Sequence, residues 1–152
     1  MLGHVDDCYS CQHNAAADLP PREEVVLTDH WRVVHSFNSA LPGWLVLVPL
    51  RHVHAFDELA GTAMLDMGAL VGDLSRALRE VLGCEKTYVM QFSEAPGFSH
   101  LHVHLVPRMP DQPDDRRGPA VFGYLGEDES AWLPTEEMDR IALEIGAALA
   151  RN

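Results

Sequence analysis

The chain has 152 residues, 47% of them hydrophobic, which suits one packed domain and is too short for two ordinary ones. Its 11 basic and 23 acidic residues give a formal net charge of -12, which disfavours binding to polymeric nucleic acid or to an anionic membrane surface. The sequence shows neither a membrane span nor a signal peptide, and its three cysteines are too few for a disulfide framework. These features predict a cytoplasmic protein.

The first half of the chain predicts an irregular start, three strands and a helix. Residues 1–22 end in a proline pair and are expected to be irregular. Short runs rich in valine, leucine and tryptophan then predict strands at 24–28, 31–37 and 45–49. Apolar residues at steps of three and four predict one long amphipathic helix over 57–82, with Asp57 as its N-cap and Gly83 just past its end.

The second half predicts two further strands and a closing helix. The strands are expected at 88–91 and 100–106, the second ended by Pro107. Residues 109–132 are rich in proline and glycine and predict a long loop, and an apolar stripe predicts a helix over 135–150. We therefore expect an α+β fold over 1–152, in which a five-stranded antiparallel sheet packs with the long helix and the C-terminal helix.

The most informative stretch places a histidine at every second residue of an apolar run. On a strand, His100, His102 and His104 share one face, and the apolar residues between them fill the other. A buried imidazole needs partners for both nitrogens, so three in a row predict a functional site. The middle ring, His102, is placed to attack an activated phosphorus or acyl centre. A catalytic zinc held by all three histidines is the competing interpretation.

The stretch His-Leu-His-Val-His-Leu-Val at 100–106 matches a pattern in which three histidines alternate with apolar residues. With Leu-Pro-Gly at 41–43, the apolar run 45–49 and Arg-His-Val at 51–53, it resembles the histidine triad (HIT) superfamily of nucleotide hydrolases and transferases. The resemblance covers roughly residues 6–108. It implies a HIT-like fold, a small-molecule nucleotide as ligand and a homodimer.

The resemblance also assigns roles by position. His102 would take up a nucleoside monophosphate as a covalent intermediate, and His104 would contact the phosphate, orienting or protonating its oxygens. Gln91 and Ser99 would bind the phosphates or the leaving oxygen. The substrate would be a dinucleoside polyphosphate, a nucleoside phosphoramidate or an acyl-adenylate.

The pair Cys8 and Cys11 has the two-residue spacing of a metal-binding turn. In some members of the superfamily, a structural zinc is completed by histidines whose positions correspond to His52 and His100. Such a zinc would pin residues 1–22 to the sheet. Alternative ligands are His4, His13 and His54, and Cys84 is expected to be a packed side chain.

Two departures from the family pattern affect substrate choice. Trp44 stands where many members have histidine, which changes the hydrogen bonds behind the nucleophile or places the indole in the base pocket. Ser36 stands where members bind ribose through Asp or Asn, and Asn38 follows two residues later. A nucleotide-binding regulatory module with little turnover is therefore a further alternative.

Overall fold

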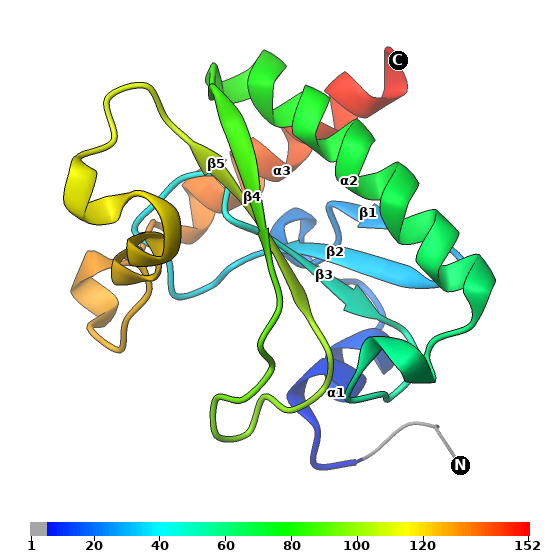
Figure 1. Ribbon diagram of the computed structural model, residues 1–152. Helices are drawn as coiled ribbons and strands as arrows, with labels where there is room; N and C mark the ends of the chain where they lie inside the picture. Colours follow the sequence, from blue (N-terminus) through cyan, green and yellow to red (C-terminus); the bar gives the residue numbers. More distant parts are fainter. Residues whose placement is uncertain (1–5) are drawn as a thin grey trace.

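The computed structural model describes residues 6–152 and contains a five-stranded antiparallel sheet (Figure 1). Its strands are β1 (Val26–Leu27), β2 (Trp31–His35), β3 (Leu45–Pro49), β4 (Lys86–Met90) and β5 (Val103–Arg108). Their order across the sheet is β1-β2-β3-β5-β4, and every neighbouring pair is antiparallel. The predicted α+β fold with this sheet is confirmed.

Alternation along the central strands gives the sheet two different faces. Six odd-numbered residues of β2, β3 and β5 point into the main core; they are Trp31, Val33, Leu45, Leu47, Val103 and Leu105. The even-numbered residues of the same strands point to the opposite face and include Arg32, Val46 and His104. Because the period of a strand is two residues, this alternation commits one face to helix packing and leaves the other for a site.

The helical face is covered by α2 (Gly61–Leu82) and α3 (Thr135–Ala150), which lie side by side on the sheet in Figure 1. Their buried residues recur at helical spacing, as Leu70, Leu74 and Leu78 do in α2. Helix α2 ends at Leu82, and its C-cap Gly83 closes the last turn with a left-handed φ of 73°. None of the helices within residues 6–152 is both long and apolar enough to cross a membrane.

The opposite face carries shorter elements. Helix α1 (Tyr9–Ala15) lies at the lower edge of Figure 1, beside the connection between β4 and β5. The segment after β5 contains the 3-10 helices η3 (Asp114–Arg116), η4 (Gly118–Tyr124) and η5 (Glu129–Ala131). Two more, η1 (Pro21–Glu23) and η2 (Phe56–Glu58), precede β1 and α2.

Several predicted boundaries differ from the structure. The long helix begins at Gly61 with Ala60 as its N-cap, because residues around Asp57 form η2 instead. Strand β5 begins only at Val103 and continues through Pro107 to Arg108, since the ladder with β4 persists there. The start of the chain contains α1 where an irregular segment was expected, and the loop expected at 109–132 contains short 3-10 helices.

Candidate functional site

A cavity of about 680 Å³ occupies the face of the sheet opposite α2 and α3. Its floor includes Val34, Val46 and Val48, and the rings of His102 and His104 stand at one side of it. Several aromatic side chains also line it, among them Phe37, Phe92, Phe98 and Trp132. An apolar floor with a few convergent polar groups is typical of a small-molecule site.

The hydrogen bonds of His102 fix which of its nitrogens can react. Its Nδ1 lies 2.9 Å from the carbonyl oxygen of His100, and because a carbonyl only accepts, Nδ1 must carry the proton. In the neutral ring, Nε2 then holds the lone pair. His102 also lines the cavity, so the structure presents an imidazole with its nucleophilic nitrogen defined.

His104 has the opposite tautomer. The indole Nε1–H of Trp44 donates to His104 Nδ1 over 3.0 Å, and both side chains are buried. An indole can only donate, so His104 Nδ1 must accept and its proton lies on Nε2. Burial, together with the nearby His102, lowers the pKa of His104 to about 4. At neutral pH His104 is therefore an uncharged hydrogen-bond donor.

This pKa predicts that acid destabilises the protein. An unfolded histidine titrates near pH 6.5, so below that pH the unfolded chain binds a proton that folded His104 refuses. The contribution is complete above about pH 6.5 and falls by up to about 3 kcal/mol on going to about pH 4. Urea unfolding across this range measures the slope. His104→Gln should make the slope less steep, because only the part due to buried His100 and other groups then remains. An unchanged slope in that variant would contradict the assignment.

The turn after β4 contributes Ser93, which the sequence analysis missed. Its Oγ accepts the backbone N–H of His102 over 3.0 Å and the side-chain N–H of Gln91 over 2.9 Å. Ser93 is buried, lines the cavity and has a φ of 57°, a conformation that costs free energy in a non-glycine residue. Neither composition nor periodicity marks such a residue, because its role depends on a turn that brings it against β5.

The turn after β2 brings Ser36 and Asn38 to the cavity wall. The Ser36 hydroxyl donates to Asn38 Oδ1 over 2.9 Å, so the two side chains act as one polar group. Buried His35 holds this turn by accepting the Gly43 N–H and donating to the Ser36 carbonyl. Gly43 itself has a φ of 85°, and a Cβ there would stand 2.3 Å from the side chain of Leu82. His35 was also missed by the sequence analysis.

Beside the cavity, Cys8, Cys11, His52 and His100 place their ligand atoms within 4.8 Å of one another. His100 Nε2 lies 2.9 Å from the Pro49 carbonyl and must donate to it, so the lone pair of Nδ1 faces the cluster. Helix α1 presents both cysteines, with Cys8 as its N-cap. The four residues named from the sequence therefore meet in one place.

Four of the separations within this cluster are close to those of tetrahedral coordination. Metal–sulfur and metal–nitrogen bonds of about 2.3 Å and 2.05 Å imply S···N distances of about 3.5 Å and an N···N distance of about 3.3 Å. The sulfurs of Cys8 and Cys11 lie 3.5 Å and 3.6 Å from His100 Nδ1. Cys11 Sγ is 3.3 Å from His52 Nδ1, and the two ring nitrogens are 3.1 Å apart. The donor set and spacing are compatible with zinc.

Other residues singled out in the sequence lie away from the cavity or the cluster. Trp44 packs behind His104 and does not line the cavity, and Gln91 reaches it only through Ser93. The Ser99 carbonyl accepts a hydrogen bond from His54. His13 and His54 are outside the cluster, Cys84 is buried and free, and His4 lies outside the described residues.

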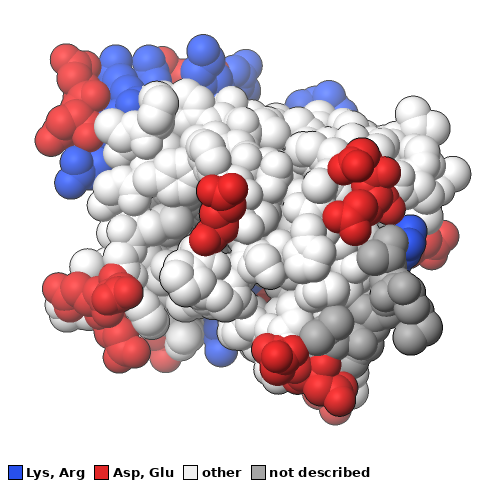
Figure 2. Space-filling model, turned by 60° about the horizontal axis from the view of Figure 1, so that its bottom comes forward, with Lys and Arg blue, Asp and Glu red and all other residues white. Residues whose placement is uncertain are grey.

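Charge is sparse on the face shown in Figure 2. Acidic side chains stand there in separate groups on a mostly uncharged surface, and the basic ones lie at the periphery, most of them along the upper edge. A polyanion would require a continuous basic stripe, which this face does not offer. The arrangement suits a ligand held inside a cavity.

Taken together, these features define an α+β protein with a histidine-lined cavity and a Cys2His2 cluster on one side of an antiparallel sheet. The HIT domain model matches residues 20–111, more than half of the chain. The protein therefore belongs to the histidine triad (HIT) family, as the sequence predicted. Comparison with curated protein sequences finds no match.

Solved structures of similar fold are numerous. A Zn-bound histidine triad family protein from Mycobacterium smegmatis is 19% identical, with a TM-score of 0.64 and coverage of 95% of this chain and 94% of that one. A histidine triad protein from Marinobacter aquaeolei VT8 is 19% identical, with a TM-score of 0.68 and coverage of 84% and 88%. A HIT-like protein from Bartonella henselae is 22% identical, with a TM-score of 0.64 and coverage of 83% and 85%. At these identities the likeness establishes the fold alone.

Proposed function

We propose that this protein cleaves or transfers at the α-phosphate of a nucleotide through a covalent intermediate on His102. The observation that carries the proposal is the tautomer of His102, whose Nδ1–H is bound by a carbonyl while Nε2 is left to attack. In the first step a bond forms from Nε2 to phosphorus and the bond to the leaving group breaks. In the second, water or another acceptor attacks the phosphorus, the N–P bond breaks and the imidazole is restored.

His104 would stabilise the negative charge on the transferring phosphate. With Nδ1 engaged by Trp44, its Nε2–H is available to bind a phosphate oxygen. An uncharged imidazole can donate a hydrogen bond but is a poor proton donor, so of the two roles considered for His104, orientation is favoured over protonation. Leaving groups that depart as anions would then be preferred. Among the three substrate classes, dinucleoside polyphosphates and acyl-adenylates fit better than phosphoramidates.

Trp44→His tests this assignment. A histidine at that position can accept a hydrogen bond as well as donate one, so it frees His104 to carry a proton on both nitrogens. We expect the rate on adenosine phosphoramidate, relative to a diadenosine polyphosphate, to rise about tenfold. The ratio of kcat/KM for the two substrates is the measurement.

Trp31→Phe is the matched control for that experiment, because it also deletes a buried indole hydrogen bond, here to Ala63, but within the main core. It should leave the substrate ratio unchanged. Equal ratios in wild type and Trp44→His would show that the indole bond does not govern the role of His104.

Of the other residues predicted to bind substrate, two are proposed to contact the nucleotide and two to support residues that do. Ser36 and Asn38 line the cavity and are proposed to meet the ribose hydroxyls. Gln91 would act by holding Ser93 against the His102 backbone. Ser99, through its carbonyl, supports the loop before β5.

We also propose that the Cys2His2 cluster holds a structural zinc. Cys8, Cys11, His52 and His100 supply a tetrahedral donor set, and the His100 tautomer is the one required of a ligand. Bound there, zinc supplies no chemistry to the reaction and cross-links α1 to the sheet. The Mycobacterium smegmatis protein of the same fold is zinc-bound.

The geometry supports the two alternative functions less well. A catalytic zinc on all three histidines requires His100 to turn away from the cysteines, although its Nδ1 faces them. A binding module without turnover has no need of a nucleophile with a fixed tautomer at the cavity wall. A homodimer and a cytoplasmic location remain part of the proposal. The outer position of β4 in the sheet supports the first, and the placement of Cys8 and Cys11 in a Cys2His2 cluster supports the second.

Intact mass spectrometry tests the proposed function. Wild-type protein mixed briefly with a diadenosine or diguanosine polyphosphate and quenched without acid should gain the mass of one nucleoside monophosphate. Fragmentation should place that mass on His102. Turnover without any such adduct under single-turnover conditions, or an adduct on another residue, would contradict the covalent mechanism.

A further inference from the structure

The cavity has a second polar end, remote from the histidines, formed by Tyr9, Glu23 and Arg32. Arg32 pairs with Val48, Val34 with Val46, and Val46 with His104 across the sheet. Arg32 and His104 are thus separated by two strand spacings across the sheet and by two residues along it, so their Cα atoms lie about 12 Å apart. A nucleotide with its phosphate at His104 and its base on the valine floor would direct the edge of the base at this end.

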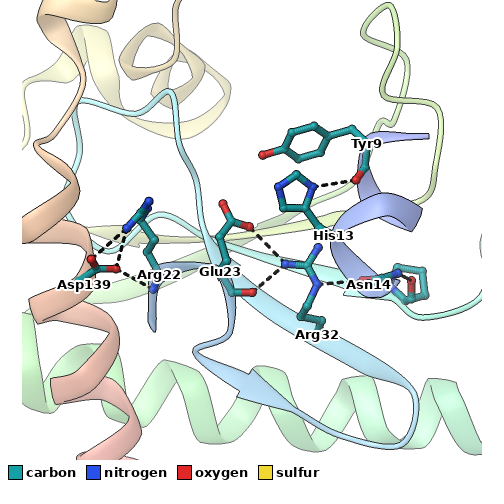
Figure 3. A network of polar contacts seen from close by, with 8 residues as sticks. Tyr9, His13, Asn14, Arg22, Glu23, Arg32 and Asp139 are labelled. Atoms are coloured by element: carbon teal, nitrogen blue, oxygen red, sulfur yellow. Dashed lines mark hydrogen bonds and ion pairs between the residues drawn. The ribbon is translucent and has the colours of Figure 1, made fainter. Parts of the chain in front are cut away.

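Figure 3 shows that Glu23 is held in place there from several sides. Arg32 Nη1 donates to the Glu23 backbone carbonyl over 2.7 Å and to its Oε2 over 3.3 Å, and Arg32 Nε donates to Asn14 over 2.8 Å. The preceding residue, Arg22, is tied to Asp139 of α3 by its backbone and its side chain. The Glu23 carboxylate is therefore preorganised, which lowers the entropy cost of binding a ligand.

The free atoms of this pair point toward the same side. Within residues 6–152, neither Oε1 of Glu23 nor Nη2 of Arg32 makes a hydrogen bond, and in Figure 3 both are directed toward the side on which Tyr9 lies. The Glu23 side chain is 13% exposed and the Arg32 side chain 3%. Of the three carboxylates that line the cavity, Glu94 and Glu127 are exposed and solvated, so Glu23 is the sheltered one.

A carboxylate is an acceptor and selects a ligand edge that carries donors. Guanine is the base with two adjacent donors on its Watson–Crick edge, N1–H and the 2-amino group. Adenine places an acceptor, N1, beside its single amino donor, and a carboxylate repels that acceptor. We propose that Glu23, positioned by Arg32, reads the base edge and makes this site selective for guanine nucleotides. The inference rests on the proposed function, because it assumes that the base occupies the valine floor.

Isothermal titration of the zinc-loaded protein with GMP, IMP and AMP tests the proposal. Wild type should bind GMP at least about tenfold more tightly than AMP, since charge-assisted hydrogen bonds to two donors are involved. IMP lacks the 2-amino group and should bind more weakly than GMP. Glu23→Gln should lose at least about tenfold in GMP affinity and change AMP affinity less than about threefold.

Glu24→Gln is the matched control, because it removes the same charge from the neighbouring, exposed position. It should leave the preference for GMP intact. Equal binding of GMP, IMP and AMP by wild type would overturn the inference without any variant, and so would an equal loss of GMP and AMP affinity in Glu23→Gln. If the adduct on His102 forms equally well from adenosine and guanosine substrates, the proposed function stands and the guanine selectivity fails. If no adduct forms but wild type prefers GMP and Glu23→Gln removes that preference, the covalent mechanism fails and the guanine selectivity stands.

Discussion

Replacing His102 with glycine is expected to lower turnover by at least about a thousandfold, while the affinity for a nucleoside monophosphate changes less than about threefold. The reason is that the variant removes the nucleophile and leaves the cavity floor, His104 and the polar end intact. Transition-state stabilisation is lost and ground-state binding is kept. Steady-state kinetics and equilibrium titration on the same preparation separate the two effects.

Added imidazole should restore part of the lost activity in this variant. The space vacated by the ring admits free imidazole, which can attack phosphorus and leave as a nucleotidyl-imidazole that water then hydrolyses. His30→Gly, in the turn between β1 and β2, is the control for the loss of a histidine and should show neither effect. If His102→Gly kept more than about a tenth of wild-type turnover, His102 would not be the nucleophile, and the attacking group would come from another residue or from a metal-bound water.

The central sheet and the histidine site could be predicted because both follow from short-range patterns. Alternation of apolar residues in β2, β3 and β5 specifies one face for helices, and the histidines at 102 and 104 necessarily project from the other. The two-residue spacing of Cys8 and Cys11 likewise placed two donors of the Cys2His2 cluster on one turn. Such patterns involve residues close in sequence, so they can be recognised without knowledge of the rest of the fold.

What escaped prediction depends on contacts between distant segments. Helix α1 has only seven residues, too few to be stable alone, so its helicity reflects its attachment to the sheet. Arg32 is a buried charge in an otherwise apolar strand. Its burial is tolerated because Glu23 and Asn14, which belong to other elements, accept its hydrogen bonds. Asp57 is a residue type that favours the N-cap position, yet it lies in η2, and α2 begins only at Gly61. Composition cannot encode these outcomes, because each is decided by tertiary partners.

Removal of the metal is expected to detach α1 from the sheet without unfolding the main core. A structural zinc contributes about 10 kcal/mol or more to the folding of small metal-binding domains. Here the main core of β2, β3, β5, α2 and α3 is separate from the cluster, so the loss should be concentrated near the N-terminus. Cys11→Ser should lose its zinc, unfold at a lower temperature and exchange the backbone amides of α1 rapidly.

The same change should weaken nucleotide binding at a distance from the metal. Tyr9 lies between the two cysteines and lines the cavity, and Asn14 of α1 holds Arg32, which in turn holds Glu23. When α1 detaches from the cluster, its residues no longer form one side of the base site, and we expect GMP affinity to fall at least about tenfold. Native mass spectrometry, hydrogen exchange and titration measure the three effects.

The control for this experiment is Cys84→Ser, which removes a buried, free thiol outside the cluster and should retain one zinc per chain. Retention of zinc by Cys11→Ser would show that the metal, if any, is held elsewhere. Loss of zinc with unchanged exchange in α1 would show that packing alone holds the helix. Tyr9 lies between the two cysteines in sequence and also lines the cavity. We therefore expect the loss of zinc to weaken nucleotide binding.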